Sequence, residues 1–109
     1  MTFDEELANR IRGLLGDRDT TEQKIFGGLA FLIGGNMAIS ASSNGGIIVR
    51  VDPAHGPELA ATTPAELMEM RGKTMAGWLR VGAEAVADDA ALAPWVERGA
   101  TYAGSLPPK

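Results

Sequence analysis

Cysteine is absent from this chain of 109 residues. Disulfides, zinc–thiolate sites, iron–sulfur clusters and cysteine nucleophiles are therefore all excluded. Long apolar runs are also missing, since no stretch approaches the ~20 residues that a membrane helix needs. The acidic start, residues 1–6, lacks the basic segment and apolar run of a signal peptide. We therefore expect a cytoplasmic protein with no membrane contact.

Positive charge and histidine are scarce as well. The chain carries 10 basic and 14 acidic residues, for a net charge of −4, whereas proteins that bind nucleic acid mainly through phosphates usually carry a basic surplus. The single histidine, His55, lies in a turn-rich stretch and has no second histidine with which to share a metal. We expect it to be an exposed loop residue rather than a general base or a metal ligand. Asp88 and Asp89 are expected to cap a helix rather than to bind a cation.

The known catalytic and phosphate-binding motifs are missing too. Gly72-Lys73-Thr74 ends like a phosphate-binding loop, but Leu67 stands where the first glycine of G-x-x-x-x-G-K-[ST] is required. The serines lack the spacing of a nucleophile elbow and have no base nearby in the sequence (Ser40, Ser42, Ser43). The sequence thus predicts no catalytic residue, no cofactor and no metal site.

Glycine, in contrast, is abundant, at 14 residues. Paired glycines at Gly34-Gly35-Asn36 and Asn44-Gly45-Gly46 separate apolar runs, and they supply the positive φ angles that tight hairpin turns need. Gly27-Gly28 is interpreted as a bulge or kink, which leaves open that the segments on either side of it form one bent strand. The expected strands are 23–27, 28–34, 36–43, 46–52 and 74–81.

Helices are expected at both ends of the chain. Residues 3–17 carry apolar side chains at helical spacing (Phe3, Leu7, Ile11, Leu14, Leu15), followed by a polar connector at 17–22. A short helix is expected at 57–61, and residues 63–66 resemble a second helix start that soon becomes irregular. After a turn at 83–87, a C-terminal helix presents one apolar face (Leu92, Trp95, Val96, Ala100, Ala103). Pro94 either opens that helix or kinks it.

These elements predict an α+β fold in a single domain, residues 1–109. Its central sheet is antiparallel and forms one of two layers, with the N-terminal and C-terminal helices packed on it. A second domain would be too small to hold a core of its own.

Several fragments resemble a known family. They are residues 6–11 (E-L-A-N-R-I), 24–31 (K-I-F-G-G-L-A-F), 35–37 (G-N-M), 47–51 (I-I-V-R-V), 72–78 (G-K-T-M-A-G-W), 92–96 (L-A-P-W-V) and the terminal 105–109. In this order and spacing the chain resembles the TfoX/Sxy N-terminal domain family, with Ile25 where a methionine often stands. The resemblance implies a two-layer domain with a central antiparallel sheet. The family is named after regulators of natural competence, a bacterial process of DNA uptake. Those regulators usually carry a C-terminal domain, so we expect a stand-alone member, and the resemblance supplies no catalytic residue.

The alternation of side chains along strands predicts a candidate site. If helices cover one face of the sheet, the other face carries an aromatic residue and two arginines among aliphatic residues (Leu32, Ile48, Arg50, Trp78, Arg80). Met75 is assigned to the helix-covered face together with Leu79. Met68, Met70 and Met75 are expected to fill core gaps or lie over a sheet edge, with an adaptable binding surface as the alternative.

Aromatic and arginine residues are favoured at the centres of protein interfaces. The leading hypothesis is therefore a non-catalytic, competence-regulator-like interaction module that binds a protein partner or a second copy of itself through these five residues. One alternative is a small-ligand-binding protein or enzyme in which Arg50, Arg80 and Lys73 hold an anionic group. The other is nucleic-acid binding through the basic side chains (Lys24, Arg50, Arg71, Lys73, Arg80), which the acidic total disfavours.

Overall fold

The computed structural model describes residues 3–25, 27–43 and 45–108, apart from the side chain of Met70. Helices and strands follow one another in an order that begins and ends with a helix. They are α1 (Glu5–Leu15), β1 (Thr20–Ile25), β2 (Gly28–Ile33), β3 (Asn36–Ala41), β4 (Ile47–Arg50), α2 (Gly56–Thr62), β5 (Glu66–Met70), β6 (Lys73–Val81), the 3₁₀ helix η1 (Ala83–Val86) and α3 (Asp89–Ser105).

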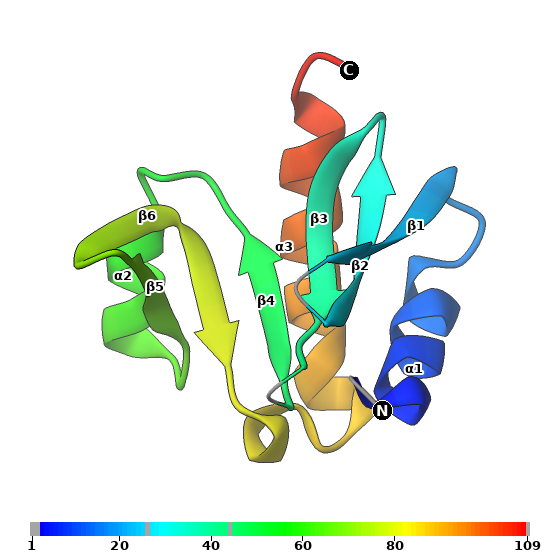
Figure 1. Ribbon diagram of the computed structural model, residues 1–109, viewed down its shortest axis with the longest axis horizontal. Helices are drawn as coiled ribbons and strands as arrows, with labels where there is room; N and C mark the ends of the chain where they lie inside the picture. Colours follow the sequence, from blue (N-terminus) through cyan, green and yellow to red (C-terminus); the bar gives the residue numbers. More distant parts are fainter. Residues whose placement is uncertain (1–2, 26, 44, 109) are drawn as a thin grey trace.

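The strands of the described residues form one six-stranded antiparallel sheet in the order β1-β2-β3-β4-β6-β5. Helix α3 packs across β2, β3 and β4, while α1 packs on α3 and β3, and α2 packs on β6 and β5. Figure 1 shows α3 passing behind the sheet, with β1 and β5 at its two edges. The expected α+β fold, with terminal helices on an antiparallel sheet, is confirmed.

The ends of the two main helices follow the chemistry of their caps. The Asp4 carboxylate accepts a hydrogen bond from the backbone N–H of Leu7 at 3.2 Å, and the helix stops at Gly16, whose φ is 63°. The Asp88 carboxylate accepts from the N–H of Ala91 at 2.8 Å and starts α3. The capping role expected for Asp88 is confirmed, and α3 continues through Pro94 rather than starting there.

Three expectations about the strands were wrong. Residues 20–22 belong to β1 rather than to a polar connector, because an edge strand with exposed side chains has the composition of a loop. The chain reverses fully between Ile25 and Gly28, which pair across β1 and β2, with Gly27 at φ 78°. Residues 66–70 form a strand, β5, where an irregular helical segment was expected.

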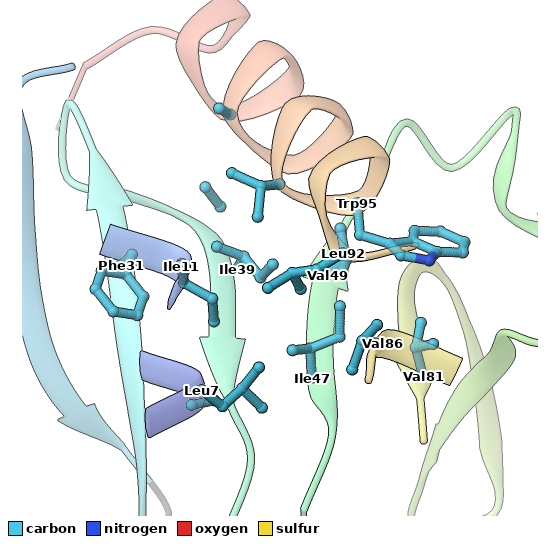
Figure 2. Packing of buried hydrophobic residues seen from close by; sticks show 14 of the residues in the cluster. Leu7, Ile11, Phe31, Ile39, Ile47, Val49, Val81, Val86, Leu92 and Trp95 are labelled. Carbon is cyan, nitrogen blue, oxygen red and sulfur yellow. The ribbon is translucent and has the colours of Figure 1, made fainter. Parts of the chain in front are cut away.

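The hydrophobic core lies between the sheet and the helices. Figure 2 shows Phe31, Ile39 and Val49 from the sheet facing Ile11 of α1 and Leu92 of α3. All five apolar residues expected on the inner face of the C-terminal helix are buried (Leu92, Trp95, Val96, Ala100, Ala103). Helix α3 approaches β3 so closely that a Cβ at Gly99 would lie 2.4 Å from the carbonyl oxygen of Ala38.

Two bulges interrupt the strand alternation. The register between β2 and β3 shifts at Phe31/Leu32, so that Ala38 is an extra residue between Met37 and Ile39. The register between β5 and β6 shifts at Leu67/Met68, so that three residues of β6, 76–78, have no partner on β5. Each bulge inserts an odd number of residues, and each therefore exchanges the faces of the side chains on its two sides.

Candidate binding site on the open face of the sheet

The face of the sheet opposite the helices is concave. It contains a hollow of about 670 Å³, which we call the open-face hollow, and all the strands of the described sheet contribute to its lining. Its lining combines apolar side chains, small residues and three longer polar side chains. The lining residues are Ile25, Leu32, Met37, Ile48, Met68, Met75 and Trp78; Gly28, Gly35, Ser40, Ser42 and Ser43; and Gln23, Arg50 and Arg80.

All five residues singled out from the sequence line this hollow (Leu32, Ile48, Arg50, Trp78, Arg80). Each is half-buried, whereas the residues that alternate with them, such as Val49 and Leu79, are fully buried in the core. The expected alternation is therefore correct for β2, for β4 and for the second half of β6. Whether a partner contacts these five residues remains a prediction.

Arg50 and Arg80 lie diagonally opposite each other on the adjacent strands β4 and β6. Arg50 pairs across the strands with Trp78, and Ile48 pairs with Arg80. The guanidinium carbon of Arg50 lies 5.2 Å from the centroid of the Trp78 ring and 5.8 Å from that of Tyr102, which comes from α3. Two aromatic faces thus hold the Arg50 side chain by cation–π attraction.

Within the described part of the chain, neither Arg50 nor Arg80 forms an ion pair with a carboxylate, although Glu66 is the cross-strand neighbour of Arg80. No Asp or Glu of the described residues lines the hollow. The open-face hollow therefore joins an apolar surface to two arginines that form no ion pair with a described carboxylate. Arg80 also lines a neighbouring hollow together with Glu66 and Glu69.

Met68 and Met75 were expected to fill core gaps or to lie over a sheet edge, and Met68 does lie on the edge strand β5. Met68 and Met75 pair across β5 and β6 and line the hollow, so they do not fill the core between sheet and helices. The expected position of Met75 beside Leu79 was wrong, because the β6 bulge lies between them. Met37, which the sequence did not single out, reaches the hollow through the β3 bulge. Met70 lies outside the described side chains.

The small residues of the lining include serines that the sequence analysis considered only as nucleophiles, a role that it rejected. Ser40 and Ser42 are buried, at 4% and 5% exposure, and they lie at or just after the end of the central strand β3. A Cβ at Gly28 would lie 2.4 Å from the carbonyl oxygen of Ala41. Small side chains in the middle of a sheet face, flanked by longer ones, leave the depth that the hollow occupies.

The other basic candidates lie elsewhere. Lys73 is exposed at the start of β6 and does not line the hollow. Of the three basic residues expected to hold an anionic group, only Arg50 and Arg80 therefore lie in the hollow. Lys24 lies on β1 and Arg71 in the turn before β6, at opposite edges of the sheet. The residues named for nucleic-acid binding therefore do not form one continuous stripe.

A second hollow of about 710 Å³ lies between α2 and α3, and the only histidine lines it. His55 is exposed and directly precedes α2, as expected for a loop residue. Asp52 and Glu58 line the same hollow, and the Asp52 carboxylate accepts a hydrogen bond from the N–H of Ala54 at 2.9 Å. Among the described residues, no three His, Cys, Asp or Glu side chains are grouped closely enough to hold a metal ion.

The arginines near the N-terminus differ from those of the hollow because acidic side chains pair with them. Arg10 pairs with Asp89 at 2.8 Å, and Arg18 pairs with Glu97 at 2.8 Å. Arg12 donates two hydrogen bonds to Glu22, and these bonds lower the pKa of the Glu22 carboxyl. Arg10 and Arg12 thus join α1 to α3 and β1, while Arg18, which follows α1, joins the α1–β1 connection to α3.

The architecture defines a class: an α+β domain whose antiparallel sheet is covered by helices on one face and carries an apolar, arginine-bearing hollow on the other. The model of the TfoX N-terminal domain family matches residues 14–103, and the chain belongs to that family. The match leaves out the fragments at 6–11 and 105–109 that also carried the resemblance. Searches of curated proteins and of solved structures returned no match. None of the described helices has the length and apolar character to cross a membrane.

Proposed function

We propose that the chain is a non-catalytic interaction module that holds a protein partner on the open face of its sheet. The observation that carries this proposal is the half-buried Trp78 in the lining of a mainly apolar hollow, with Arg50 and Arg80 on the same face beside it. Tryptophan and arginine dominate the binding energy of protein interfaces, and hot spots sit in hollows of this kind. A regulatory role agrees with the competence regulators after which the family is named.

The composition of the hollow supports binding rather than catalysis. Among the described residues that line it there is no histidine and no carboxylate, so serine and arginine are left without a general base. Ser40 and Ser42 line the hollow, and the Ser40 hydroxyl is 3.4 Å from the carbonyl oxygen of Ala41. We therefore expect these serine hydroxyls to contact a bound group rather than to act as nucleophiles.

A second candidate function is the binding of a small anionic molecule. It is favoured by the size of the hollow, about 670 Å³, which falls within the range of about 300–1,000 Å³ for small-ligand sites. Arg50 and Arg80 would then hold the anionic group.

Photocrosslinking tests the proposal. A benzoylphenylalanine at position 78 replaces one aromatic group by another, and the same group at the exposed Thr101 of α3 serves as the matched control. In extracts of the native host, position 78 should crosslink to one defined protein, or to a second copy of the chain. Position 101 should not, and excess unlabelled chain should compete.

The Trp78→Ala chain should compete at least tenfold less well, since truncating a hot-spot aromatic residue typically costs more than about 1.4 kcal/mol. Equal crosslinking from positions 78 and 101, or equal competition by Trp78→Ala, contradicts the proposal. A small molecule bound to the purified protein in native mass spectrometry, and lost from Arg50→Gln, would favour the second candidate instead.

A further inference from the structure

We propose that the occupant of the open-face hollow is an amphipathic helix of another protein that carries two carboxylates about one turn apart. Arg50 and Arg80 pair with these carboxylates, while the apolar side of the helix packs on Trp78, Ile48 and the methionines. The inference rests on the proposed function and names the chemistry of the partner.

The charge of the hollow selects an acidic partner. The molecule has a net charge of −4, yet the described lining residues include two arginines and no carboxylate. Elsewhere Arg10, Arg12 and Arg18 are each paired with a carboxylate of the chain. A carboxylate entering the hollow meets guanidinium groups that have no ion pair to give up, in surroundings where apolar walls strengthen the attraction.

The spacing of the two arginines fits a helix. Because Arg50 faces Trp78 and Arg80 faces Ile48, the two arginines are diagonal neighbours on β4 and β6. Diagonal positions on adjacent strands lie roughly 7–8 Å apart. Side chains at positions i and i+4 of a helix are separated by a rise of about 6 Å, and flexible arginine side chains span the difference. Arg50, Trp78, Arg80 and Ile48 form a group of four on these two strands. Trp78 and Ile48 lie diagonally opposite each other in it and present apolar surface between the two charges.

The backbone of the sheet also favours a helical occupant. Strands β2, β3, β4 and β6 each have a neighbouring strand on both sides, so their backbone groups are engaged within the sheet outside the bulges at Ala38 and residues 76–78. An extended peptide lying on this face would lose water from its own N–H and C=O groups without gaining partners. A helix satisfies those groups internally. The lining extends from β1 to β5, a width of about 24 Å for strands ~4.8 Å apart, which exceeds the roughly 10–12 Å diameter of a helix with its side chains.

A second copy of the chain fits this face poorly. A two-fold contact through the hollow would bring Arg50 and Arg80 of one copy against the same residues of the other, which places four guanidinium groups in one interface. The described lining residues supply no carboxylate to compensate them. Like charges in a desolvated interface oppose association, so the acidic helix belongs to a different protein.

Glu66 gives the inference a distinctive consequence. It is the cross-strand neighbour of Arg80 on β5, and it is exposed. Although no ion pair joins the two, its negative charge opposes an incoming carboxylate at Arg80. Replacing Glu66 by Gln should therefore tighten the binding of an acidic helix, by about two- to threefold for one exposed charge.

The test is a selection from a display library of 16-residue helical peptides with random outer positions, performed on the full chain. Selected peptides should combine an apolar face with Asp or Glu three or four positions apart. For the best synthetic peptide, fluorescence anisotropy should show at least a tenfold loss of affinity with Arg50→Gln and with Arg80→Gln. Arg50→Lys should lose less, and Glu66→Gln should gain. Arg98→Gln, which removes a charge on the helix-covered side, should have no effect. Circular dichroism confirms that each variant is folded.

The outcomes separate this inference from the proposed function. Selected peptides whose binding depends on Trp78 but not on the two arginines are one contradicting result, and selected peptides with neutral or basic faces are another. Either result overturns the inference of an acidic helix, while the proposal of a protein partner on the open face still stands. A library that yields no binder, or only binders insensitive to Trp78→Ala, also overturns the inference. In that case the crosslinking at position 78 decides the proposed function independently.

Discussion

At the scale of single residues, Gly99 sets how closely α3 approaches the sheet. A Cβ there would lie 2.4 Å from the carbonyl oxygen of Ala38 and 3.3 Å from a methyl group of Val49. Backbone atoms of a central strand cannot move aside cheaply. We expect Gly99→Ala to lower the free energy of unfolding by about 1–3 kcal/mol, as overpacking a core does. Urea denaturation followed by tryptophan fluorescence measures the loss.

Gly13 provides the matched control for Gly99. It also lies inside a helix, α1, but a Cβ there would meet nothing within 4 Å. Gly13→Ala should therefore raise the free energy of unfolding, by up to about 1 kcal/mol from helix propensity alone. If both substitutions shift stability in the same direction, the tight contact of α3 with β3 is not what Gly99 provides.

At the scale of elements, the Arg12–Glu22 pair joins α1 to the edge strand β1. The Arg12 guanidinium donates hydrogen bonds of 2.5 and 2.8 Å to the Glu22 carboxylate and lowers its pKa. A lowered folded-state pKa contributes stability above the unfolded value of about 4.3, and that stability is lost as the pH falls through the folded value. Because the pair is exposed, its contribution is about 0.2–1 kcal/mol.

Glu22→Gln should therefore cost stability at pH 7 and almost none at pH 2. The measurement is the difference between the unfolding free energies of the wild-type chain and the variant at several pH values, at low and high salt. The difference should shrink as the pH falls below about 4, and also in high salt, because exposed pairs are screened. A difference that stays constant with pH would mean that Glu22 acts through packing rather than charge.

At the scale of the whole molecule, the C-terminal segment is bound to the β2–β3 hairpin. The amide nitrogen of Asn36, a buried residue, donates a hydrogen bond of 3.0 Å to the carbonyl oxygen of Pro107. Pro108 lies against Gly34, which belongs to the turn between β2 and β3. Asn36→Ala should lower the free energy of unfolding by about 1 kcal/mol or more, since it removes a hydrogen bond from a buried group.

A double-mutant cycle isolates this contact. Removing residues 107–109 deletes the acceptor, so Asn36→Ala should destabilise the shortened chain less than the full chain. Urea denaturation of the four chains provides the comparison. Strictly additive effects would show that Asn36 stabilises the hairpin without involving the C-terminal segment.

Much of the fold could be predicted because the relevant signals are local. The apolar spacing from Leu7 to Leu15, the cap at Asp88 and the paired glycines at 34–35 each act within a few residues. The edge strands were harder to predict. β1 exposes most of its side chains and β5 follows a helix-like start at Thr63, so neither shows the alternation that a half-buried strand requires.

The candidate site divides in the same way. The placement of Ile48, Arg50, Trp78 and Arg80 followed from the period of two, because β4 and the end of β6 are regular. The placement of Met37 and Met75 did not, because each lies beyond a bulge that exchanges the two faces. Each bulge is a property of how two strands pair, β2 with β3 and β5 with β6, and one or two residues of either strand carry no signal of it.

By itself, the sequence determined the family, the α+β class, the terminal helices and the face on which the tryptophan and its two arginines emerge. These depend on hydrophobic period, caps and turn residues, which act over a few positions along the chain. Only the tertiary structure decided that this face is hollow, that methionines from three strands line it and that its arginines form no ion pair with a carboxylate of the described residues. Such properties come from residues far apart in the chain, and they exist only once the strands are side by side.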